Sequence, residues 1–144
     1  MSDGRSFRAG PLCWHLLQTF WVGGLWGLHF VFLPGLERLG MAPLLIAEVR
    51  ASLVPLLLGF TACCVALQML VLVRAEGLRA ALRDVRGQAL CAAQLLIAGH
   101  YGAAAWLPGQ SYWAVFSYLA VAMCGLVLVM RPAPGSVSEP GMAS

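Results

Sequence analysis

The sequence contains no lysine and little charge of either sign. Charged residues make up 10% of its 144 residues and hydrophobic residues 60%, whereas soluble globular domains carry about 25% charged residues. This balance excludes a soluble domain and indicates an integral membrane protein. All nine basic residues are arginine, which indicates a GC-rich bacterial genome and hence the bacterial cytoplasmic (inner) membrane. No basic face interleaved with aromatics is present, so we expect no nucleic-acid partner.

Several kinds of catalytic motif are also missing. The chain has no glycine-rich phosphate loop, no HExxH and no GxSxG. No carboxylate lies inside a long apolar window, since Glu37 and Glu48 fall at the edges of such windows. The five cysteines form no CxxC pair and lie in apolar surroundings, so they are interpreted as small hydrophobic residues. We therefore predict that the protein is not an enzyme.

Four windows have the roughly 20 apolar residues that a helix needs to cross about 30 Å of hydrocarbon. The predicted fold is an all-α, polytopic membrane protein, with a four-helix bundle in residues 1–131 and a disordered, Pro/Gly/Ser-rich tail over 132–144. Pro34 is expected to end the first helix, because proline disfavours helix at the residue before it. The four spans are predicted at about 12–33, 53–73, 88–107 and 112–130.

Arginine placement predicts the orientation of these spans. Seven of the nine arginines lie in the N-terminal tail, in the loop between spans two and three, and just after span four. These segments share one side of the membrane. The positive-inside rule therefore predicts cytoplasmic N- and C-termini.

Two connections are predicted to be helical. Residues 43–52 begin with Pro43, a residue suited to a first helical turn, and should lead at the outer interface into span two through a kink at Pro55. The inner loop has an apolar face at helical spacing and a separate arginine face, which predicts a short helix lying on anionic headgroups of the inner leaflet. The alternative is a docking site for a protein partner. The apolar face is Leu78, Ala81, Leu82 and Val85, and the basic face is Arg79, Arg83 and Arg86.

Small residues in spans one and three predict close helix packing. Gly23 and Gly27 form a GxxxG pattern, which lets a second backbone approach in a membrane. We expect these glycines to face Gly99 and Gly102 of span three. A seam between copies of the chain, or with another membrane protein, is the alternative.

Two histidines lie at membrane depth, where ionisable residues are costly and usually functional. At 1.5 Å per residue, His29 lies about 6 Å from the outer end of its span and His100 about 10 Å, so both share the outer half. Each could hydrogen-bond across helices in its neutral form. As alternatives, the pair could bind haem iron or copper, or relay a proton.

Residues 14–60 resemble the bacterial domain-of-unknown-function 4149 family, which is related to the eukaryotic transmembrane protein 205 group. The shared features are WVGGLW at residues 21–26, the Leu33 and Pro34 exit, and a proline opening the second span. The inner loop AEGLRAALRDVRGQ and the four-helix layout also fit, over about residues 12–131. This resemblance implies a small four-helix inner-membrane protein without an established activity. A local likeness to the copper-resistance D family, His15 ahead of WVGG, supports the haem or copper alternative.

The sequence thus predicts a structural or partner-binding membrane bundle without a cofactor. The alternatives are a haem- or copper-binding protein for metal handling or redox chemistry, and a small transporter-like component.

Overall fold

The computed structural model describes residues 6–106 and 111–133, and every regular element in them is helical. The predicted all-α class is therefore confirmed. The predicted tail over 132–144 lies outside the described residues except for its first two positions. The elements are α1 (Ser6–Gly27), the π-helical turn η1 (Leu28–Phe32), α2 (Leu33–Arg38), α3 (Pro43–Glu76), α4 (Leu78–Arg83), α5 (Val85–Trp106) and α6 (Ser111–Val129).

Three segments within the described ranges are long and apolar enough to cross a membrane: Gly10–Arg38, Pro43–Glu76 and Tyr112–Val129. These features are those of a multi-pass membrane protein. The 22 residues of α5 include Gln88, Gln94 and His100, which make that helix less hydrophobic than the other three.

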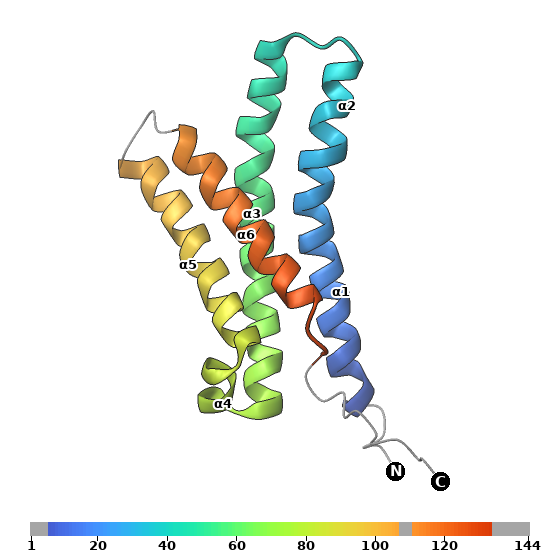
Figure 1. Cartoon of the computed structure of the whole chain (residues 1–144), viewed down its shortest axis with the longest axis vertical. Coiled ribbons are helices and arrows are strands. Elements are labelled where there is room, and N and C mark those ends of the chain that lie inside the picture. Colours follow the sequence, from blue (N-terminus) through green and yellow to red (C-terminus); the bar gives the residue numbers. More distant parts are fainter. Residues whose placement is uncertain (1–5, 107–110, 134–144) are drawn as a thin grey trace.

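The bundle consists of two helical pairs (Figure 1). In the first, α1 continues through η1 into α2 and runs beside α3; the second is the shorter α5–α6 hairpin. Helices α1 and α5 each pack on both α3 and α6. The two ends are called here the α2 end and the α4 end. At the α2 end, α2 and the start of α3 extend beyond the hairpin (Figure 1).

Pro34 does not end the first helix, contrary to the prediction, because the chain accommodates it with a π-turn. The N–H of Leu33 donates to the carbonyl oxygen of Leu28, five residues back. Pro34 then occupies the first turn of α2, where its missing N–H costs little. The helix ends only at Arg38, and Gly40 with φ +73° reverses the chain.

The predicted lead-in helix at residues 43–52 is part of α3 rather than a separate element. Pro43 opens α3 as expected, and the helix runs through Pro55 without interruption for 34 residues. All α3 side chains therefore follow one helical register from the α2 end to the α4 end.

A buried polar network joins α1 to α3 in the core. Trp21 Nε1–H donates to Gln68 Oε1 at 2.8 Å, and Gln68 Nε2–H donates to the Trp14 carbonyl oxygen at 3.2 Å. All three side chains are fully buried. The network fixes the rotation of α1, with Trp14, Trp21 and Leu25 facing its neighbours.

This rotation turns the predicted glycine seam away from the bundle. A Cβ added at Gly23, Gly27 or Gly102 would meet no atom within 4 Å, and one at Gly99 would meet only Trp113, at 3.8 Å. The predicted packing of span one on span three along these glycines is thus not the arrangement of the bundle. Close approach occurs instead at Gly125 of α6, where a Cβ would lie 2.7 Å from Val22 Cγ2.

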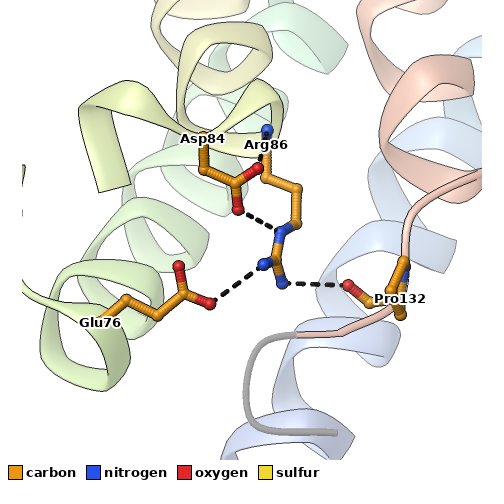
Figure 2. Close-up of polar contacts among 4 residues, drawn as sticks. All are labelled: Glu76, Asp84, Arg86 and Pro132. Carbon is orange, nitrogen blue, oxygen red and sulfur yellow. Dashed lines mark hydrogen bonds and ion pairs between the residues drawn. The ribbon is translucent and has the colours of Figure 1, made fainter. Parts of the chain in front are cut away.

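At the α4 end, one arginine ties several segments together (Figure 2). Arg86 pairs with Asp84 (Nε–Oδ2, 2.6 Å) and with Glu76 (3.0 Å), and it donates to the Pro132 carbonyl oxygen at 3.1 Å. Asp84 also accepts the Arg86 backbone N–H and so caps α5. The guanidinium group therefore links the end of α3, the start of α5 and the segment after α6.

The predicted short helix is present in part as α4, which ends at Arg83, whereas Val85 and Arg86 of its predicted faces belong to α5. Arg79 and Arg83 are exposed on it, and within residues 6–106 and 111–133 neither has an ion-pair partner. Contact of these two arginines with headgroups stays a prediction, whereas the Arg86 guanidinium contacts carboxylates of its own chain.

Candidate functional site

A cavity of about 350 Å³ lies between the helices toward the α2 end. Its volume is within the 300–1,000 Å³ typical of small-ligand sites. Most of the lining is apolar and comes from η1, α2, α3, α5 and α6. The side chains that bring polar atoms to it are His29, Arg50, His100 and Tyr118.

The two histidines selected from the sequence thus line one cavity. His29 comes from the π-turn, and its ring centroid is 6.1 Å from that of Tyr118. Its ring nitrogens have no hydrogen-bond partner among the described residues. The π-turn shifts the helical register by about one residue, and such turns often occur at functional sites.

His100 is held in place by α6. Its Nδ1 lies 2.8 Å from Ser117 Oγ, and the Ser117 hydroxyl donates to the Ala114 carbonyl oxygen at 3.1 Å. A hydroxyl has one hydrogen, so the tautomer that allows both contacts at once has the proton on Nδ1 of His100, which then donates to Ser117 Oγ. Nε2 is then left with a lone pair. The sequence predicted that each histidine hydrogen-bonds across helices. The structure shows such a bond for His100 but none for His29 among the described residues.

Arg50 is the residue that sequence reasoning missed. The sequence analysis did not select Arg50 as a site residue, yet it lines the cavity beside the histidines. It has no hydrogen-bond or ion-pair partner in residues 6–106 and 111–133. Once α3 is taken as one continuous helix, the spacing of four residues places Arg50 on the face that lines the cavity. These residues are Ala47, Arg50, Ala51 and Val54.

Tyr118 was also not predicted. Its hydroxyl donates to the carbonyl oxygen of Leu25 and so joins α6 to α1. The side chain is only 5% exposed. Because its hydrogen is committed to Leu25, the phenol oxygen can offer the cavity only a lone pair.

The donor set does not fit a protein-bound copper or zinc ion. Within the described part of the chain no group of three or more His, Cys, Asp or Glu side chains is placed to hold a metal, and catalytic zinc sites use three protein ligands. The guanidinium of Arg50 would also repel a cation. Two imidazoles and one guanidinium instead suit a group that carries negative charge and accepts hydrogen bonds.

No protein-family model, curated protein or solved structure matches the chain. Its function is therefore argued from the chemistry of the site itself.

Proposed function

We propose that this chain is a four-span membrane protein, with both termini in the cytoplasm, that binds a small anionic group in the cavity near the α2 end. Three spans meet the length and hydropathy that a membrane requires, and α5 is the proposed fourth. At 22 residues α5 extends about 33 Å, and beyond Arg86 it carries no charged residue.

Arginine placement supports the orientation. The exposed Arg74, Arg79 and Arg83 lie at the α4 end, while the α2 end has Arg38 and Arg50 near Glu37 and Glu48. The positive-inside rule puts the α4 end in the cytoplasm. In this orientation the cavity lies in the outer half of the membrane, and Arg79 and Arg83 face the anionic inner leaflet.

The unpaired guanidinium of Arg50 is the observation that carries the proposed binding function. Arg50 is exposed on the protein itself, so at the proposed depth in the membrane its charge would meet lipid, where a charge is costly unless an opposite charge compensates it. No carboxylate of the described chain pairs with Arg50, so a bound anion would supply the missing charge. A monoanion would offset the single charge of Arg50.

Short, water-soluble anions test this proposal, because they can reach the cavity from the aqueous phase. Ethyl phosphate or butyrate should raise the melting temperature of the purified protein in nonionic detergent. A ligand at ten times its Kd stabilises by about 1.4 kcal/mol. Arg50→Gln should abolish the shift. Arg38→Gln is the matched control, because Arg38 is exposed and does not line the cavity.

If neither anion stabilises the wild-type protein, or if Arg50→Gln responds as the wild type does, the binding proposal is wrong. An absorbance spectrum and metal analysis of the same sample test the haem or copper alternative. A Soret band lost in both His29→Ala and His100→Ala would favour haem binding by this imidazole pair.

The four-span orientation has its own test. A chain with all five native cysteines replaced by alanine would carry one new cysteine, from Arg79→Cys or from Leu39→Cys. Membrane-impermeant maleimide added to intact cells should label the Leu39→Cys protein only. Labelling of the Arg79→Cys protein instead would reverse the orientation.

A further inference from the structure

A second cavity adjoins the candidate site. It is an apolar groove of about 1190 Å³ between α1 and α3, open on one side, and Tyr101 of α5 also lines it. Leu28 and Pro55 line both the groove and the anion cavity. The two cavities are therefore adjacent, and this pair of residues borders both.

Two glycines keep the groove free where the helices are close. A Cβ at Gly24 would lie 3.3 Å from Leu57 Cδ1, and one at Gly59 would lie 3.2 Å from the Tyr101 hydroxyl oxygen. That hydroxyl donates to the Pro55 carbonyl oxygen at 2.5 Å. The contact holds Tyr101 beside the junction of the two cavities.

A cavity with four polar side chains in its lining, adjacent to an apolar groove, matches the two parts of an amphiphile. Resting on the proposed anion binding, we propose that the ligand is a phosphate monoester of a long-chain alcohol. Its head occupies the space among His29, Arg50 and His100, and its chain lies in the groove. The groove residues Leu56 and Phe60 are 71% and 47% exposed, so the chain would pack against apolar side chains on one side and membrane lipid on the other.

Hydrogen-bonding capacity selects phosphate over carboxylate. Four polar side chains line the anion cavity. The Tyr118 hydroxyl already donates to Leu25, which leaves His29, Arg50 and His100 for the three terminal oxygens of a phosphate monoester. Two of them can accept the paired N–H groups of Arg50. The protonated third can donate to Nε2 of His100, the lone pair left by the bond to Ser117. A carboxylate has no hydrogen to donate there.

The charge balance points the same way. The second pKa of a phosphate monoester is about 6, so the singly charged form exists beside the doubly charged form near neutral pH. The singly charged monoester offsets the single charge of Arg50. His29 can donate to the phosphate from either ring nitrogen, because neither nitrogen has a hydrogen-bond partner among the described residues.

Binding of hexadecyl phosphate, palmitate and ethyl phosphate to the full chain in one fixed nonionic detergent tests the inference. Hexadecyl phosphate and palmitate have equal chain length, so their difference isolates the head group. Cys63→Trp should fill the groove, because Cys63 is exposed and lines it. Cys13→Trp is the control, since Cys13 is exposed but lines neither cavity. A second groove variant, Leu56→Trp, guards against a fold defect in the first.

The expected result is that hexadecyl phosphate binds the wild type more tightly than palmitate does. Both groove variants should weaken hexadecyl phosphate about tenfold, equivalent to about 1.4 kcal/mol, and leave ethyl phosphate unchanged. The control should bind all three ligands as the wild type does. The wild type and each groove variant are measured in the same micelles. Partition of hexadecyl phosphate into detergent therefore cancels when its binding to the two proteins is compared.

Two results together would overturn the placement of the alkyl chain in the groove and leave the anion site standing. These are ethyl phosphate binding that depends on Arg50, and hexadecyl phosphate binding that the groove variants do not weaken. Palmitate binding as tightly as hexadecyl phosphate would overturn the phosphate assignment. Failure of every anion to bind would overturn the anion site and this inference with it.

Discussion

Replacing Gly125 by alanine should destabilise the bundle more than the loss of any exposed contact. The backbone of α6 crosses α1 at this residue. An added Cβ would lie 2.7 Å from Val22 Cγ2 and 2.9 Å from two ring atoms of Trp21. Real Cβ contacts are not that short, so either α6 or the indole ring must move.

Neither movement is free. The Trp21 ring is fully buried and donates to Gln68, which is itself bonded to the Trp14 backbone. A shift of the ring would weaken this network, and a shift of α6 would loosen its packing on α1. Overpacking of this kind costs about 1–3 kcal/mol, and disruption of the Trp21 bond places the overpacking cost of Gly125→Ala in the upper part of that range. The higher helix propensity of alanine, about 1 kcal/mol, offsets part of this cost.

Gly23→Ala is the matched control, because the same change on the opposite face of α1 meets no atom within 4 Å. Alanine favours helix over glycine by about 1 kcal/mol, so this variant should be as stable as the wild type or more so. Thermal unfolding in detergent, followed by circular dichroism, measures both. Equal melting temperatures for Gly125→Ala and the wild type would refute the described crossing of α1 and α6. A large loss in Gly23→Ala would instead support a seam between copies of the chain.

Three further predictions concern buried and clamped side chains. Gln68→Met keeps the volume but removes two interhelical hydrogen bonds, and should cost about 1–2 kcal/mol in the same unfolding assay; an unchanged melting temperature would contradict the network. Arg86→Gln should lower stability by about 1 kcal/mol in low salt, with Arg79→Gln as the neutral control, and equal effects would argue against the α4-end clamp. His100→Ala should lower the melting temperature more than His29→Ala, because only His100 is buried and hydrogen-bonded; the reverse order would contradict the site geometry.

The sequence predicts the helices well because they depend on local rules. Apolar windows of sufficient length, the first-turn position of Pro43 and the spacing of Leu78 and Ala81 each involve one segment only. Depth counting at a fixed rise per residue also selected His29 and His100, which line one cavity. These inferences need no knowledge of how one helix is rotated against another.

What the sequence could not predict depends on rotation and register between helices. GxxxG made Gly23 and Gly27 the expected seam, but the buried bonds of Trp21 with Gln68 set the rotation of α1 and turn that face outward. The contact at Gly125 becomes visible only when α6 is placed across α1. A single glycine in an apolar window carries no such information.

Three departures from local expectation share the α2 half of the bundle. Pro34 lies two residues after the π-turn, α3 continues through Pro55 without interruption, and Arg50 has no hydrogen-bond or ion-pair partner among the described residues. Pro55 and Arg50 each cost stability, since helices disfavour interior proline and a membrane disfavours unpaired charge, whereas the π-turn accommodates Pro34 at little cost. They meet at one cavity, which is lined by His29 of the π-turn, by Pro55 and by Arg50. Local rules tend to be broken together where function compensates for the cost. A bound anion would offset the largest of these costs, the charge of Arg50.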